Sequence, residues 1–341
     1  MQSYSYQGHP TGWFQLEWSD ALKPGDVKRL RIFGMEVILF RTEGGTVRVA
    51  DAFCPHLGAN IGEGGQVVGE NIACPFHGWE FGPDGKNCRI PNVARANPRI
   101  SLREWHVAEL SGLIVVWFDS LGRDPLWNWE GAPEFSDLEH FAPLSYWSGG
   151  IRSMIPPQYL ENAPDVLHFP FVHGAAEPAS IVRWEESGPN LFVDYELKFG
   201  GGREPSWLTP NGPVVGLIAT ESCMGIGVVR FSLEDLLMLQ IVCVTPVDDG
   251  QSMVFSTTTA KVDGSPDGLA DQRAMKMMEA QHLQISNDFR IWENQRYVER
   301  PPYAGHEELY FPRFRRWIAQ FYPRQDAKGI FAADRVDEAV R

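Results

Sequence analysis

Two short segments that each combine one cysteine with one histidine constrain this chain more than any other feature. They read Cys54-x-His56 and Cys74-x-x-His77, with glycine and proline around both. Two thiolates and two imidazoles can hold a structural zinc ion, although zinc sites usually present their cysteine pairs and histidine pairs separately. One cysteine and one histidine per loop suit a [2Fe–2S] cluster in which cysteines bind one iron and histidines the other. We therefore predict a cluster of this kind rather than zinc or a chance pair of loops.

The chain is long enough for two domains. Short β-rich runs such as VKRLRIF and MEVILF alternate with glycine-containing turns up to GLIVVWFDS, which ends near residue 119. A connector rich in proline and tryptophan follows, and a boundary belongs in such a segment. We predict an all-β domain over residues 10–120 and a second domain over residues 121–341.

The second part predicts an α+β architecture. Residues 153–174 read as helix in their early half, with Pro170 expected to end or kink it. Strand-like runs fill residues 180–262, and residues 267–298 read as one long helix. An antiparallel sheet wrapped around a long C-terminal helix, a helix-grip arrangement, is the expected fold.

A second metal site is suggested by Asp165-x-x-His168-x4-His173. A [2Fe–2S] cluster moves one electron at a time and has no open position for O₂, whereas two histidines and one carboxylate leave iron with open positions. Asp165 and His168, three residues apart, are expected to share a helix face. A break at Pro170 would then bring His173 back towards the same metal, with Asp165 accepting the N–H of the metal-bound His168.

The third ligand has to be a carboxylate far along the chain. In the predicted long helix, Asp288 lies about 60° from Ile285 at roughly 100° per residue, on or beside an apolar stripe. An acid on an apolar helix face is costly unless it is paired or binds a metal. Asp288 is therefore the predicted ligand, and Glu293 on the other edge is the alternative. Trp292 either faces the metal pocket or simply packs between helix and sheet.

The segments CPHLGANIGEGG and IACPFHGWEF resemble the N-terminal domain of the Rieske non-heme iron oxygenases. The similarity is strongest to the branch that holds cholesterol 7-desaturase and the oxygenase component of 3-ketosteroid 9α-hydroxylase. ENAPDVLHFPFVH and NDFRIWENQ also resemble the family's mononuclear iron motifs. The resemblance implies an Fe(II) held by His168, His173 and Asp288, beside a Rieske cluster held by Cys54, His56, Cys74 and His77.

The resemblance implies a terminal oxygenase that uses O₂ and reductase-supplied electrons to hydroxylate or desaturate a hydrophobic substrate, most simply a sterol or steroid. Oxidative demethylation, oxidation of an aromatic substrate and a non-catalytic electron-transfer and lipid-binding protein are the alternatives. In the family, Asp165 would bridge to His77 of a neighbouring subunit in a head-to-tail homotrimer. The sequence contains no dinucleotide, flavin or plant-type ferredoxin motif, so NAD(P)H would act through a separate reductase, with or without a ferredoxin.

A sheet around a helix encloses a cavity, which is the expected substrate site. Trp79 is expected to cover the cluster, and Asn162 to lie near the mononuclear iron. Trp292, Met224 and Asn162 are expected to contact the substrate. The predicted cavity lining consists of Phe192, Val193, Leu217, Met224, Leu237, Met238 and Trp292.

Composition limits the partners and the compartment. Thirty basic and 44 acidic residues give a formal charge of −14, which argues against non-specific binding to nucleic acids or anionic membranes. The N-terminus lacks a signal-peptide pattern, and no apolar run approaches the roughly 18 residues of a membrane span. Five cysteines make a disulfide framework improbable. A cytoplasmic protein is the expectation.

Overall fold

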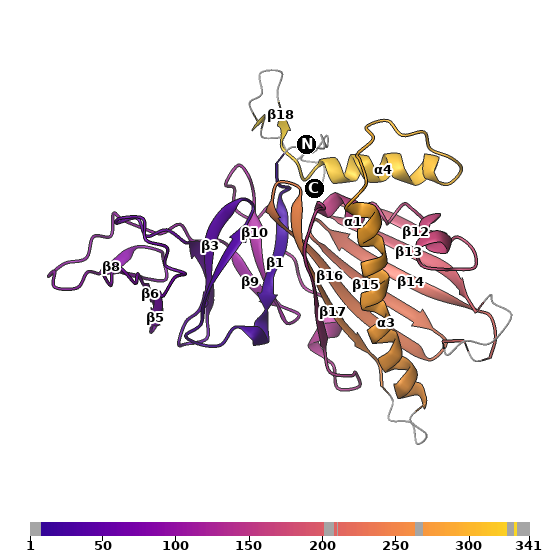
Figure 1. The fold of residues 1–341 in the computed structure, drawn as a ribbon, viewed down its shortest axis with the longest axis horizontal. Coiled ribbons are helices and arrows are strands. Elements are labelled where there is room, and N and C mark those ends of the chain that lie inside the picture. Colours follow the sequence, from indigo (N-terminus) through magenta and orange to yellow (C-terminus); the bar gives the residue numbers. More distant parts are fainter. Residues whose placement is uncertain (1–7, 201–207, 210, 263–268, 326–330, 333–341) are drawn as a thin grey trace, which may run out of the picture.

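The computed structural model describes residues 8–200, 208–209, 211–262, 269–325 and 331–332. Figure 1 shows an elongated molecule with small β-sheets at one end and a broad sheet with helices at the other. The predicted order, an all-β part followed by an α+β part, is confirmed.

The N-terminal part consists of three small antiparallel sheets with the strand orders β1-β10-β9, β2-β3-β4 and β5-β6-β7-β8. Every residue of β10 is buried because both of its faces are covered. The strands are β1 (Gly12–Trp18), β2 (Val27–Ile32), β3 (Met35–Arg41), β4 (Val47–Asp51), β5 (Gln66–Val68), β6 (Asn71–Ala73), β7 (Glu80–Phe81), β8 (Asn87–Arg89), β9 (Val107–Leu110) and β10 (Leu113–Phe118).

The C-terminal part is built on a seven-stranded antiparallel sheet with the order β11-β17-β16-β15-β14-β13-β12. Apart from the edge strand β11, strands that are consecutive in the sequence are neighbours in the sheet. The strands are β11 (Ser145–Arg152), β12 (Ser180–Ser187), β13 (Asn190–Phe199), β14 (Val214–Cys223), β15 (Ile226–Leu233), β16 (Leu236–Asp248) and β17 (Gln251–Ala260).

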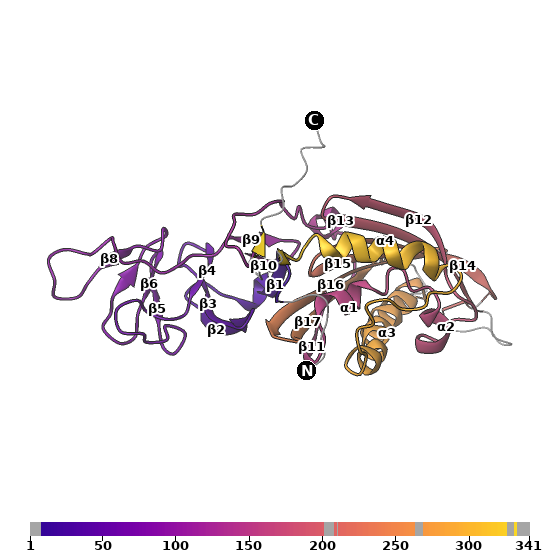
Figure 2. The same cartoon turned by 90° about the horizontal axis from the view of Figure 1, so that it is seen from above.

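Helices cover one face and one end of this sheet. They are α1 (Pro156–Leu160), α2 (His168–Val172), α3 (Leu269–Trp292) and α4 (Glu307–Ala319), and a two-stranded ribbon of β18 (Arg324–Gln325) and β19 (Phe331–Ala332) follows them. Figures 1 and 2 show α3 against one face of the broad sheet. Helix α3 contains neither glycine nor proline, which favours a long uninterrupted helix. Within the described ranges, no helix combines the length and apolar character that crossing a bilayer requires.

The apolar stripe of α3 packs against the sheet as predicted. Near its start the helix buries Ala274, Met277 and Met278 against β15 and β16. Near its end it buries Ile285, Phe289 and Trp292 against β16 and β17. Asp288 lies on this buried side, with only 6% of its surface exposed.

The two parts share an extensive interface. The Thr245 hydroxyl donates to the Gln15 carbonyl at 2.6 Å, and the Phe33 N–H donates to the Pro246 carbonyl at 3.0 Å. Met224, in the turn after β14, has no exposed surface and packs in the core with Phe14 of β1. The expectation that Met224 contacts the substrate is therefore wrong, since this turn faces the N-terminal part.

The segment that carries the first two predicted iron ligands differs from the expected single helix. Helix α1 ends at Leu160, turns follow, and α2 begins at His168. Pro170 lies in the first turn of α2, where its missing N–H costs no helical hydrogen bond, so it does not end the helix. Asp165 precedes α2, so the predicted helix face shared by Asp165 and His168 does not exist.

Candidate metal centres and active site

The two Cys/His loops have the same backbone geometry. The N–H of Cys54 donates to the Ala59 carbonyl at 2.8 Å, and the N–H of Cys74 donates to the Trp79 carbonyl at 2.9 Å. Gly58 and Gly78 close the turns by donating to the carbonyls of Cys54 and Cys74 at 2.9 and 3.0 Å, respectively. Both glycines have φ near +70°, a conformation that other residues rarely adopt. Each loop therefore holds its cysteine at an equivalent place in the turn, while the histidine follows two residues later in one loop and three residues later in the other.

The four predicted cluster ligands lie together in two layers. Cys54 and Cys74 are each 3% exposed and lie close enough for Cys74 to act on the Cys54 thiol, while the rings of His56 and His77 meet at 4.9 Å between centroids. Burial raises the pKa of the Cys54 thiol to about 11, against hydrogen bonds from the His56 and Leu57 N–H groups that favour the thiolate. Such N–H groups are what a sulfur ligand of a cluster requires.

A single shared ion fits these four residues poorly. Tetrahedral zinc needs all its donor atoms within a few ångströms of one another. The described residues contain one group of three or more donor atoms within 4.8 Å of each other, and it lies elsewhere. A paired-cysteine layer and a paired-histidine layer suit a dinuclear cluster. Trp79, expected to cover the cluster, stacks on His56 with 4.2 Å between ring centroids.

The group of three donors consists of His168, His173 and Asp288. The Nε2 atom of His173 lies 3.6 Å from Oδ2 of Asp288, and the two imidazole centroids are 5.0 Å apart. Two imidazoles and one carboxylate that converge on one point match the ligand set of an open non-heme iron site. The structure thus brings the three predicted ligands together, whereas Glu293 pairs with Arg152 at 3.6 Å.

The pKa values show how unfavourable this group is without a cation. Burial raises the pKa of Asp288 to about 6, against the charge of His168 and a hydrogen bond from Asn162. Burial, followed by the neighbouring His168, lowers the pKa of His173 to about 4. Burial also acts to lower the pKa of His168, but the interactions with Asp165 raise it overall. A divalent cation would stabilise the ionised carboxylate and the neutral imidazole together.

Asp165 orients His168 through its main-chain carbonyl, whereas its carboxylate was the expected acceptor of the ring N–H. The Nδ1–H of His168 donates to the main-chain carbonyl of Asp165. Because a carbonyl only accepts, this bond leaves the Nε2 lone pair of His168 for a metal. The Asp165 carboxylate accepts the N–H groups of Leu167 and His168 at 3.2 Å each and so caps the start of α2. The helix-terminal role and the predicted electron bridge are compatible, since the carboxylate remains partly exposed.

Asn162 lies in the turn between α1 and α2, beside Asp288. Asn162 and Asp288 line the same small hollow, so Asn162 lies beside the candidate metal site. Trp292 is 4% exposed, packs on Tyr159 and Phe289, and lines only a small hollow beside Asp288. Its carbonyl accepts the Gln158 amide N–H at 2.7 Å, which ties α1 to the end of α3.

A cavity of about 800 Å³ opens on His173 and Asp288. It runs along α3 from Met277 to Asp288, a rise of about 16 Å at about 1.5 Å per residue. Most of the side chains that line it are apolar, and they include Phe169, Leu197, Phe199, Leu208, Ile218, Val229, Phe231, Met238, Met277 and Ile285. A smaller chamber of about 170 Å³ adjoins it at His168 and His173 and contains Thr220, Ser222 and Gln240.

The predicted cavity lining was correct for Met238 and largely wrong elsewhere. Leu217 is 40% exposed on the outer face of the sheet, and its neighbour Ile218 lines the cavity instead. Phe192 lies under Arg183, and Leu237 packs towards the N-terminal part. Val193 faces inwards but is sealed in the core. Successive strand residues alternate between faces, so a register error of one residue exchanges the two sides.

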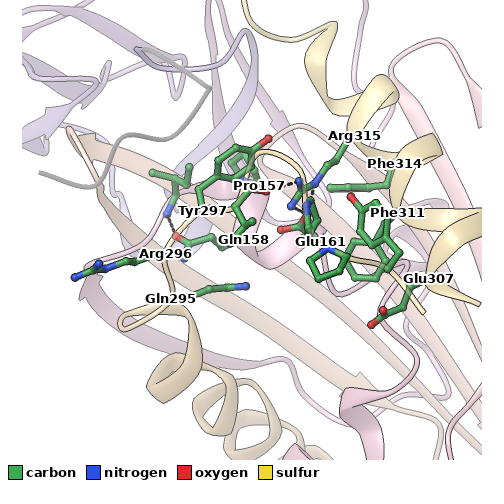
Figure 3. A pocket seen from close by; sticks show the side chains of 15 residues that line it. Pro157, Gln158, Glu161, Gln295, Arg296, Tyr297, Glu307, Phe311, Phe314 and Arg315 are labelled. Atoms are coloured by element: carbon green, nitrogen blue, oxygen red, sulfur yellow. Dashed lines mark hydrogen bonds and ion pairs between the residues drawn. The ribbon is translucent and has the colours of Figure 1, made fainter. Parts of the chain in front are cut away.

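A separate hollow of about 180 Å³ lies between α1, α4 and residues 295–303 (Figure 3). At its floor Glu161 pairs with Arg315 at 2.9 Å, and Arg315 donates to the Val298 carbonyl at 2.7 Å. Its lining includes Gln158, Glu161 and Gln295, which also line the small hollow beside Asp165. This partly buried ion pair therefore holds the segment that covers the outer side of the site. The sequence contained no indication of this role for Glu161.

Gln284 is the other residue that sequence reasoning missed. It lines the large cavity on α3 one turn before Asp288. The helical spacing of four residues from a predicted ligand is the signal that would have found it.

Comparison with known proteins agrees with these two centres. Residues 12–108 match the Rieske [2Fe-2S] domain, and residues 116–322 match the 3-Ketosteroid 9alpha-hydroxylase C-terminal domain. The chain is 29% identical to cholesterol 7-desaturase of Xenopus laevis, over 96% of this chain and 75% of that protein. It is 26% identical to the oxygenase component of 3-ketosteroid-9-alpha-monooxygenase of Rhodococcus rhodochrous, over 91% and 80% of the two chains.

Solved structures share the fold. Dicamba monooxygenase bound to dicamba superposes with a TM-score of 0.71 at 20% identity, over 91% of this chain and 96% of that one. NdmB of Pseudomonas putida superposes with a TM-score of 0.65 at 16% identity, over 90% and 89%. Because the domain matches span both parts of the molecule, the chain belongs to the Rieske oxygenases, as a terminal component whose catalytic domain is of the 3-ketosteroid 9alpha-hydroxylase type.

Proposed function

We propose that this oxygenase uses O₂ and electrons from a separate reductase to hydroxylate or desaturate a sterol or steroid. The observation that carries the proposal is the convergence of His168, His173 and Asp288 on the wall of a large apolar cavity. When bound, a [2Fe–2S] cluster would supply single electrons, and Fe(II) at the three donors would supply the site of O₂ reduction. Cys54, His56, Cys74 and His77 would hold the cluster.

The residues around the cavity have roles that do not depend on the metal. Apolar side chains such as Phe231 and Met238 exclude water and bind a hydrophobic substrate by its surface. The carbonyl of Asp165 holds His168 in one tautomer, and Asn162 hydrogen-bonds Asp288. These contacts keep the donor atoms aimed at one point before any ligand arrives.

The choice of a sterol or steroid is supported by the cavity and by the relatives. A cavity of about 800 Å³ lies in the range of sites that enclose a whole small molecule. Its length along α3 and its few polar groups suit a long, rigid hydrophobe. Relatives over most of the chain are named for cholesterol and for a 3-ketosteroid, which favours the same substrate class.

We propose that the enzyme acts as a head-to-tail homotrimer in which Asp165 of one copy bridges to His77 of the next. Figure 2 shows β5–β8 at the end of the molecule far from α2 and α3, so the two centres of one chain are well separated. Each centre has exposed apolar residues around it. They are Phe53, Leu57 and Phe76 at the cluster loops, and Leu167, Phe171 and Ile291 at the second centre. Two such patches on one chain suit contact between copies.

The competing function is a non-catalytic electron-transfer protein with a lipid-binding domain. Such a protein needs the cavity but has no use for a buried carboxylate beside two imidazoles. The unfavourable burial of Asp288 therefore favours the oxygenase.

The test is oxygen uptake with a generic reductase and a panel of sterols, 3-ketosteroids and aromatic acids, with products identified by mass. We expect oxygenated or desaturated product from a sterol or steroid. Turnover of the aromatic acids alone would overturn the substrate class. His168→Ala should keep the visible Rieske spectrum but lose turnover and one iron per chain, and an unchanged iron content would contradict the assigned site.

A further inference from the structure

The second ring nitrogen of His173 is buried and has no hydrogen-bond partner among the described residues. This atom, Nδ1, is on the far side of the imidazole from Nε2, which lies 3.6 Å from Asp288. The Oε1 atom of Gln284 is also buried and without a partner in the described part of the chain. Both side chains line the same cavity. Two complementary polar atoms on side chains of one cavity are thus left unsatisfied, and each costs free energy.

Helix geometry explains how the imidazole of His173 can contact both Gln284 and Asp288. Gln284 and Asp288 are four residues apart on α3 and so lie on the same helix face, about 5–6 Å apart. The two nitrogens of an imidazole point to different sides of the ring. If Nε2 of His173 points towards Asp288, Nδ1 can therefore point towards Gln284, one helical turn earlier on α3.

In the other histidine of the site, His168, the second ring nitrogen has a hydrogen-bond partner. The Nδ1–H of His168 already donates to the carbonyl of Asp165, which leaves Nε2 for a metal. Metal-binding histidines nearly always donate their second N–H to a carbonyl or carboxylate. The Gln284 side chain lines the same cavity as His173, one helical turn before Asp288.

We propose that Gln284 is a positioning residue whose Oε1 accepts the Nδ1–H of His173, which fixes the tautomer that offers the Nε2 lone pair to iron. The orientation of the amide decides the outcome. A carboxamide oxygen only accepts, so it keeps the proton on Nδ1. An amide NH₂ turned towards the ring would instead move the proton to Nε2 and block coordination. This role rests on the proposed iron site.

The test compares three variants of the intact enzyme by the rate at which an anaerobic ferrous chelator removes the third iron of each chain. Gln284→Met keeps the length of the side chain and removes the acceptor, and we expect iron release to be about 10–100-fold faster. Gln284→Glu keeps an acceptor oxygen and should release iron at the wild-type rate or more slowly. Gln281→Met is the matched control, because Gln281 lines the same cavity from the same helix but donates to Gln240 at 3.0 Å.

The visible Rieske spectrum of each variant reports on folding independently of the third iron. Wild-type release from Gln284→Met would overturn the proposal. Equal acceleration in Gln284→Met and Gln284→Glu would also overturn it, since shape rather than the acceptor would then be responsible. A wild-type enzyme that contains only two irons per two sulfides would instead refute the proposed function, so the two failures are distinguishable.

Discussion

His173 of α2 and Asp288 of α3 meet at 3.6 Å between Nε2 and Oδ2 on the wall of the large cavity. This contact joins the two segments that carry the predicted iron ligands. It also distinguishes Asp288 from the alternative ligand Glu293. Glu293 pairs with Arg152 instead of a histidine. The acid on the buried side of α3 is therefore the one within reach of the imidazoles.

Asp288→Ala should remove the third iron and abolish turnover, because two imidazoles alone hold Fe(II) weakly. Iron and acid-labile sulfide measured on the purified variant should fall from three irons to two per two sulfides. Glu293→Ala, at the residue directly after α3, is the matched control, and it should retain three irons. If the two variants swapped these results, Glu293 would be the ligand.

Asp165→Asn should keep both metal centres and slow electron transfer between them about 10–100-fold, the usual effect of changing a residue that supports a metal ligand. An asparagine oxygen can still accept the N–H groups of Leu167 and His168, so the start of α2 should persist. The measurement is the reoxidation of the reduced cluster in a stopped-flow experiment with substrate and O₂. Glu185→Gln, an exposed carboxylate paired with Arg183, controls for loss of charge. Wild-type reoxidation in Asp165→Asn would remove the bridge.

The predicted site residues that the structure brings together rest on local chemistry. The Cys54 and Cys74 loops repeat one short pattern, and backbone turns of fixed geometry follow from their glycines. Asp288 was predicted because a helix has a regular period, and because an acid on the apolar side of a helix is costly unless it is paired or binds a metal. Such signals are contained within a few residues, so one sequence suffices to read them.

The predictions that failed depend on contacts between distant segments. Met224 is apolar and ends a strand, but only the packing of its turn on Phe14 shows that it faces the N-terminal part. Leu217 and Ile218 are equally apolar, so hydrophobicity does not reveal which of them faces α3. The tautomer of His168 depends on a main-chain carbonyl, which leaves no trace in residue identity.

Ile218→Trp should weaken substrate binding at least about tenfold, because a larger side chain occupies the cavity and overpacking is costly. The adjacent variant Leu217→Trp places the same ring on the outer face of the sheet and should bind normally. Quenching of tryptophan fluorescence by the sterol or steroid that turns over would measure both affinities. Equal weakening in the two variants would place the substrate elsewhere.

Phe171→Glu should dissociate the proposed homotrimer, because Phe171 is 88% exposed beside the second centre and a charge there opposes burial. Light scattering coupled to size exclusion should show a monomer that keeps both metals and turns over slowly. Leu126→Glu, a change at an exposed apolar residue of the connector, is the comparison and should remain assembled. Full turnover by a monomeric wild-type enzyme would rule out electron transfer between copies.

His282 should make the enzyme less stable in mild acid. Its ring stacks on Trp147, Nε2 hydrogen-bonds Ser145 at 3.2 Å, and Nδ1 is buried without a partner in the described chain. Burial lowers the pKa of His282 below 6.5, so the unfolded chain binds a proton that the folded ring refuses. Stability is therefore complete above pH 6.5 and declines as the pH falls towards the folded pKa of His282.

His282→Phe keeps the stack on Trp147 and removes the titration, so its thermal midpoint should fall less between pH 7 and 5 than that of the wild type. Parallel curves for the two proteins would assign the acid sensitivity to other groups, of which His9, partly buried and also with a lowered pKa, is the first to test.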